Sequence, residues 1–100
     1  MEPVQLVGID DLKGGEKHLL RKFANEYVEK ISKLVNNEVS IKLHVKVRSK
    51  TGKQHQYVIK VMVRSAAGNF ESEESDWELK RTLHKVFTNI ENQVKHKFRE

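Results

Sequence analysis

Apolar and polar residues alternate with a period of two through the middle of the chain. The apolar positions of this alternation are Ile41, Leu43, Val45 and Val47, followed by Tyr57, Ile59, Val61 and Val63. Such a period places one set of side chains on one face of a strand, so two half-buried strands are predicted, from Ser40 to Lys50 and from Tyr57 to Arg64. The turn-forming segment between them, Thr51-Gly52-Lys53-Gln54, predicts that they form a hairpin.

A helical period of apolar residues precedes this hairpin. Its members are Leu19, Leu20, Phe23, Tyr27, Val28, Ile31, Leu34 and Val35. The segment Lys13-Gly14-Gly15-Glu16 is expected to break any regular element, so the first helix is predicted to begin at Glu16. It is predicted to end near Asn36-Asn37, because asparagine accepts the left-handed backbone conformation that terminates helices.

A second helical stripe follows the hairpin. It consists of Leu79, Leu83, Val86, Phe87, Ile90 and Val94. The segment Ser75-Asp76-Trp77-Glu78 has the spacing of a capping box, in which a serine oxygen and a glutamate carboxylate satisfy the first helical amides. The second helix is therefore predicted to begin there.

Two shorter strands complete the predicted elements. The first covers Pro3 to Ile9, and the last covers Asn69 to Glu74, with Phe70 inward and an exposed acidic side. The element order is β-α-β-β-β-α, which predicts an α+β fold like that of double-stranded-RNA-binding domains. Two helices would pack on one face of a four-stranded mixed sheet, with the first two strands parallel. The length of 100 residues is that of one domain, so residues 1–100 are expected to form a single domain.

Charge is distributed unevenly along the chain, which carries a formal net charge of +5. Seven basic residues and no acidic residue lie between Ser40 and Arg64. The next acidic residues form a cluster without Lys or Arg, made of Glu71, Glu73, Glu74, Asp76 and Glu78. A basic face attracts polyanions, whereas the acidic segment would repel them or neutralise a neighbouring basic element.

The uncovered face of the predicted sheet is the main candidate for binding RNA. Its candidate residues are Lys42, His44, Lys46, Arg48, Lys60 and Arg64, together with Lys50 and Lys53 at the hairpin tip. Arg81 and Lys85 on the polar side of the last helix are further candidates. Each phosphate contact releases counterions, so such a face would bind strongly and in a salt-sensitive way. The alternative is that this is only the polar outer face that an exposed sheet needs.

Catalytic and metal-binding chemistry finds no support in the residue pattern. The chain has no cysteine, and its five histidines are spread over four elements without the spacing of a metal site. It contains no nucleophile elbow and no phosphate-binding loop. We therefore expect a protein that is not an enzyme and that needs no cofactor, metal or small-molecule substrate. No apolar run approaches the length of a membrane span, so a cytoplasmic protein without a membrane partner is expected.

Four segments of the chain resemble the ribosome hibernation promoting factors, also called the ribosome-associated inhibitor or sigma-54 modulation family. They are VQLVGI, LLRKFANEYVEKISKL, SIKLHVKVRS and NFESEESDWELKRTLHKVFTNIENQVKHK. In that family a short acidic run leads into a final helix that ends in a segment rich in Lys and His. The residues Glu71–Asp76 and Lys95-His96-Lys97 stand in those places here.

The resemblance implies a short-form family member that binds ribosomal RNA on the small ribosomal subunit. Such a protein would block the channel for messenger and transfer RNA under stress, and it would act by occupancy alone. One alternative is a double-stranded RNA binding module, although such modules carry a basic cluster where this chain has Ser75-Asp76-Trp77-Glu78. Another is a protein interaction module with Val58 and Met62 in a dimer face; a homodimer is left open but not predicted.

Overall fold

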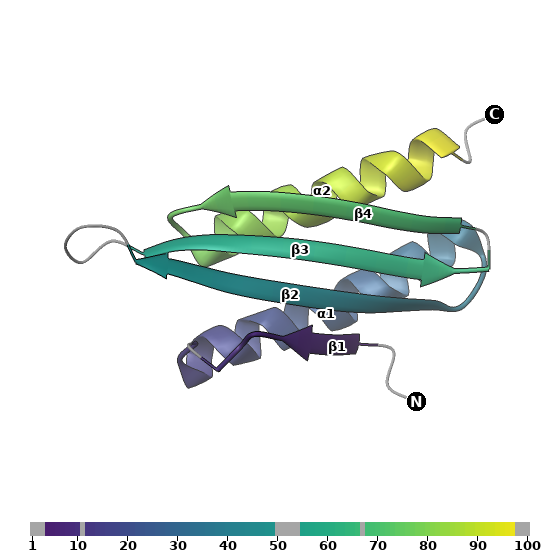
Figure 1. Cartoon of the computed structure of the whole chain (residues 1–100). Helices are drawn as coiled ribbons and strands as arrows, with labels where there is room; N and C mark the ends of the chain where they lie inside the picture. Colours follow the sequence, from purple (N-terminus) through teal and green to yellow (C-terminus); the bar gives the residue numbers. More distant parts are fainter. Residues whose placement is uncertain (1–3, 11, 50–54, 67, 98–100) are drawn as a thin grey trace.

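Two helices cover one face of a four-stranded sheet in the computed structural model of the chain (Figure 1). The structure describes residues 4–10, 12–49, 55–66 and 68–97. Its elements are β1 (Val4–Val7), α1 (Gly14–Val35), β2 (Val39–Ser49), β3 (His55–Ser65), β4 (Gly68–Asp76) and α2 (Leu79–Lys97). The strands lie in the order β1-β2-β3-β4, with β1 parallel to β2 and the other neighbours antiparallel. This confirms the predicted α+β fold class and the mixed sheet.

The core lies between the inner face of the sheet and the apolar stripes of both helices. The register pairs Ile41 with Val63, Leu43 with Val61 and Val45 with Ile59, and all six side chains are buried. The largest fully buried helix side chains that cover them are Leu20, Ile31, Leu83, Val86, Phe87, Ile90 and Val94. Burial of these side chains is the main free-energy gain on folding, at about 1.5–3 kcal/mol for each large one.

The first helix begins at Gly14, so the prediction that Lys13 to Glu16 would break the element was wrong. The Glu16 carboxylate accepts the N–H of Lys13 at 2.9 Å and so holds the helix start. Glycine lowers the stability of a helix by roughly 0.5–1 kcal/mol through its backbone entropy, and this cost does not prevent the helix from including Gly14 and Gly15. The predicted end is confirmed, since Asn36 adopts the left-handed conformation with φ of 52°.

The predicted start of the second helix was also wrong. β4 continues to Asp76, with Ser75 opposite Val58 in the ladder, and α2 begins only at Leu79. The Asp76 carboxylate accepts the N–H of Trp77 at 2.6 Å, in the short segment between β4 and α2. Pairing with β3 therefore extended the strand beyond the predicted Asn69–Glu74.

The first strand ends at Val7, two residues before the predicted end at Ile9, and the predicted start at Pro3 lies outside the described residues. Gly8 follows with φ of +76°, and a Cβ atom there would lie only 2.4 Å from the Val45 carbonyl oxygen. The chain thus leaves the sheet at a residue that only glycine can fill without displacing β2.

Phe87 is the largest fully buried side chain, and its ring stacks on Tyr27 with centroids 4.4 Å apart. We expect Phe87→Ala to lower the free energy of unfolding by about 3–5 kcal/mol, because it leaves a cavity between both helices and the sheet. Denaturant unfolding followed by circular dichroism measures this change. The exposed neighbour Thr88 provides the control: Thr88→Ala should change stability by less than about 0.5 kcal/mol. Similar losses in both variants would contradict the described core.

Tyr57 connects β3 to the start of α1. Its hydroxyl donates a hydrogen bond of 2.6 Å to the Glu16 carboxylate. This bond, with a smaller contribution from burial, raises the pKa of Tyr57 to about 12. Burial opposes ionisation of Glu16, but the hydrogen bonds from the Lys13 amide and Tyr57 outweigh it and lower the pKa of that carboxyl.

The fold therefore favours the protonated form of Tyr57. Its contribution to stability is complete below the ordinary pKa of 10 and is lost as the pH rises toward 12. We expect an ultraviolet titration of tyrosinate to show a step near pH 12 that is absent from Tyr57→Phe, in which the remaining step belongs to Tyr27, whose pKa is also raised by burial. In Glu16→Gln, that step should move back toward pH 10 with both tyrosines still present. Ionisation of Tyr57 near pH 10 in the unaltered protein would contradict the hydrogen bond.

Candidate nucleic-acid interface

The sheet face opposite the helices, here called the open face, carries the side chains that the alternation predicted. Lys42, His44, Lys46 and Arg48 project from β2 and are all exposed, whereas β3 contributes Gln56, Val58, Lys60, Met62 and Arg64. Figure 1 shows that both helices lie behind the sheet, so no helix covers this face. The predicted hairpin-tip residues Lys50 and Lys53 lie outside the described residues.

Positive charge on the open face is concentrated along β2. Lys42, Lys46 and Arg48, here called the basic row, all project from this one strand. Residues two apart on a strand lie about 7 Å from each other, and long Lys and Arg side chains can each contact a separate phosphate. The β3 residues opposite the basic row are Met62, Val58 and Gln56, which are uncharged. A polyanion following β2 would therefore meet cations without acids across the strand pair.

Two carboxylates of β4 border the basic surface of the open face. Glu71 and Glu73, here called the acidic edge, are exposed on the open face. Phe70 of β4 points to the opposite side, toward the helices, and is buried as predicted. Glu73 lies opposite Lys60 in the ladder, and Glu71 Oε1 lies 3.7 Å from Lys60 Nζ. Lys60 is therefore partly neutralised, whereas the basic row lies one strand further from the acids.

The helix candidates Arg81 and Lys85 are separated from the sheet candidates. Arg81 makes two hydrogen bonds to the Asp76 carboxylate, at 2.7 and 2.8 Å, and Lys85 Nζ lies 2.7 Å from the same carboxylate. These contacts, from Arg81 first and then Lys85, hold the pKa of Asp76 well below its ordinary value. Asp76 has the inward parity of β4, so this cluster belongs to the helix side of the molecule.

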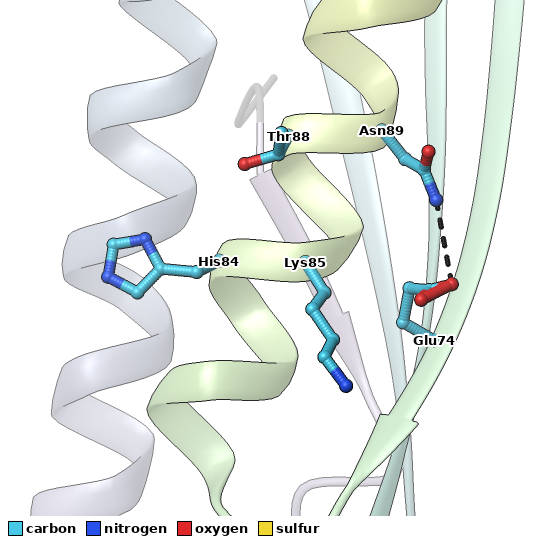
Figure 2. Close-up of a pocket in the computed structure, with 5 residues that line it drawn as sticks. All are labelled: Glu74, His84, Lys85, Thr88 and Asn89. Atoms are coloured by element: carbon cyan, nitrogen blue, oxygen red, sulfur yellow. Dashed lines mark hydrogen bonds between the residues drawn. The ribbon is translucent and has the colours of Figure 1, made fainter.

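A hollow on the same side contains further polar residues. Its lining consists of Glu74, His84, Lys85, Thr88 and Asn89. Figure 2 shows Asn89 reaching toward Glu74, with 3.5 Å between the amide nitrogen and the carboxylate, while His84 points toward α1. The His84 ring meets Phe23 edge-on at 4.9 Å. Since Glu74 and Lys85 already have partners of opposite charge or polarity, this hollow offers little unpaired charge to a ligand.

Metal ligands do not gather in the described part of the chain, where no three His, Asp or Glu side chains could share an ion. None of the described helices combines the length and the apolar character required to cross a bilayer. Among the described residues, the charged side chains of the open face are therefore the main candidates for binding a partner.

Comparison with known proteins gives a match in structure alone. No family model and no curated protein sequence matches the chain. The N-terminal domain of Protein Y from Thermus thermophilus superposes with a TM-score of 0.71 over 93% of each chain, at 15% identity. A ribosomal subunit interface protein from Coxiella burnetii gives a TM-score of 0.65 over 97% of this chain and 98% of its own, at 12% identity.

This chain has the fold of both proteins. Each superposition covers nearly the whole length of both proteins compared, so the likeness includes both helices as well as the sheet. The family resemblance carried by the four sequence segments is thereby confirmed at the level of the fold. A fold alone does not determine a function, so the function must be argued from the surface.

The Asp76 cluster gives a test of how the helix start is held. Because the pKa of Asp76 is lowered in the folded protein, its contribution to stability is present at neutral pH and is lost as the pH falls below about 4. We expect Asp76→Asn to melt at a lower temperature at pH 7, with the difference shrinking in acid. Glu78 provides the control, since it lies 3.9 Å from Arg81 and is exposed. A melting temperature unchanged by Asp76→Asn at pH 7 would contradict this role.

Proposed function

We propose that this protein is an RNA-binding translation inhibitor that associates with the small ribosomal subunit in the cytoplasm. It would bind ribosomal RNA through the open face and block the channel used by messenger and transfer RNA, as in ribosome hibernation under stress. The observation that carries the proposal is the basic row on an uncovered sheet face. Its fold, shared with a protein named for the ribosomal subunit interface, supports the choice of partner.

The chemistry of the open face suits a backbone reader. Lysine and arginine neutralise phosphates and release counterions, which gives affinity without base recognition. Tyr57, the aromatic residue of β3, has its hydroxyl bound to Glu16 on the helix side. Single-strand readers stack bases on aromatic side chains of their sheets, and the described open-face residues of the strands include no Phe, Tyr or Trp. Recognition would therefore depend on charge and on the shape of folded RNA.

Inhibition would require occupancy of the channel and no reaction. The Asp76 carboxylate and the cations Arg81 and Lys85 on the helix side are paired with one another. A folded domain that fills a channel excludes its substrates sterically, without a cofactor or a turnover step.

The alternative of a double-stranded RNA binding module is disfavoured by the start of α2. Such modules present free basic side chains there to phosphates. In this protein the segment Ser75-Asp76-Trp77-Glu78 precedes α2, and the basic residues Arg81 and Lys85 that follow it are bound to Asp76 at 2.7 Å. An RNA phosphate would have to displace a carboxylate from both cations.

Sedimentation with purified ribosomal subunits across a salt series tests the proposal. We expect the unaltered protein to pellet with the small subunit at low salt and to dissociate as salt rises. Lys46→Glu combined with Arg48→Glu should weaken binding at least about tenfold, because two phosphate contacts become repulsive. The plot of log affinity against log salt concentration should also become less steep, by the amount that corresponds to about two phosphate contacts.

A second double variant separates a local effect from the change in net charge. Lys22→Glu with Lys33→Glu alters the charge by the same amount on the exposed side of α1. It should bind the small subunit within about threefold of the unaltered protein, since long-range effects are screened beyond about 10 Å. Equal losses in the two double variants would reject the open face as the interface. Absence of ribosome binding at low salt would reject the function itself.

A further inference from the structure

We propose that the acidic edge limits the open face to one RNA backbone, which follows the basic row, and excludes a duplex that would lie across the sheet. Glu71 and Glu73 would thus determine which RNA the surface accepts. This inference rests on the proposed function and specifies the ligand of the same site.

The register of the sheet fixes where charges of each sign lie. β2 is separated from β4 by β3 alone, so the basic row and the acidic edge run along strands about 10 Å apart. Met62 links Lys42 to Glu71, because it is the ladder partner of both. Both carboxylates face the same solvent as the basic row, and the Glu71 side chain is 62% exposed.

The charge of the open-face residues is therefore positive on β2 and negative on β4, with the exposed Arg64 as a further cation at the end of β3, opposite Asn69. The β2 side of the open face carries three cations and no acid. On β3, Lys60 Nζ lies 3.7 Å from the Glu71 carboxylate. On β4, the open-face residues that flank the two glutamates are Asn69 and Ser75. An anionic chain lowers its energy by lying lengthwise over β2 and raises it by crossing toward β4.

A single backbone and a duplex meet this surface differently. One backbone over the basic row keeps its phosphates about 10 Å from the acidic edge, where water and salt screen much of the repulsion. Double-stranded RNA presents two backbones on either side of a groove, and proteins that bind it contact phosphates of both. With one backbone on β2, the second would come to the side of β4, next to Glu71 and Glu73.

Protection of an edge strand is the other role that exposed glutamates commonly have, because charge prevents pairing with further strands. Here a side chain of α2 already blocks the middle of the β4 edge, since Gln93 Nε2 donates a 2.7 Å hydrogen bond to the Glu71 carbonyl oxygen. The Glu71 carboxylate instead faces Lys60 on the open face. Its charge is thus directed at the surface that would receive RNA.

Equilibrium binding of the full chain to a single-stranded RNA and to a duplex of equal length tests this inference. Glu71→Gln combined with Glu73→Gln should raise affinity for the single strand about threefold and for the duplex about tenfold, because the second backbone lies closer to the carboxylates. The ratio of the affinity for the single strand to the affinity for the duplex should therefore fall. Glu71→Asp with Glu73→Asp keeps both charges and should retain the preference of the unaltered protein.

Glu26→Gln with Glu29→Gln is the matched control, since both residues are exposed on α1 and the change in net charge is identical. It should leave the ratio of the two affinities unchanged. An equal gain for both RNAs in the Glu71 and Glu73 variant, or no gain, would overturn the inference.

Lys46→Glu with Arg48→Glu, measured in the same series, distinguishes this failure from failure of the proposed function. If that variant loses RNA binding while the acidic edge has no effect, the open face binds RNA and only its restriction to one backbone is wrong. If that variant binds both RNAs normally, the open face is not the RNA site and both proposals fall.

Discussion

Burial of a single apolar face of the sheet is the constraint on which the rest of the molecule depends. Ile41, Leu43 and Val45 of β2, with their partners on β3, can leave water only beneath the two helices. Both apolar helix stripes are used for that purpose, and none remains for the other side. The opposite face must stay in solvent, where its side chains are free to be selected for a partner.

The period of two in β4 divides its acidic residues between two tasks. Asp76 and Glu74 point to the helix side, where Asp76 holds Arg81 and Lys85 and Glu74 meets Asn89. Glu71 and Glu73 point to the open face and stand beside Lys60. One acidic strand therefore both fixes the start of α2 and sets the border of the basic surface, because neighbouring residues on a strand face opposite sides.

The likeness to the two solved structures concerns the fold, whereas the chemistry of the open face bears on function. The likeness extends over nearly the whole chain but at 15% and 12% identity, so it concerns the path of the backbone. The surface contributes what the backbone cannot, namely cations in a row, acids at one edge and no aromatic platform among the described open-face residues. An affinity generated by such a surface would be electrostatic, sensitive to salt and largely independent of base sequence.

Local periodicity in the sequence was enough to determine the element order, the inner and outer faces of β2 and β3, and the end of α1 at Asn36. These features depend on side-chain alternation and backbone preference, which the sequence states directly. The starts of both helices required tertiary structure, because Glu16 holds the start of α1 with Tyr57 as its partner, and pairing with β3 draws Ser75 and Asp76 into β4. Only the folded chain could decide that Arg81 and Lys85 are paired with Asp76 while the basic row stays uncovered, since these contacts join residues whose relation depends on packing.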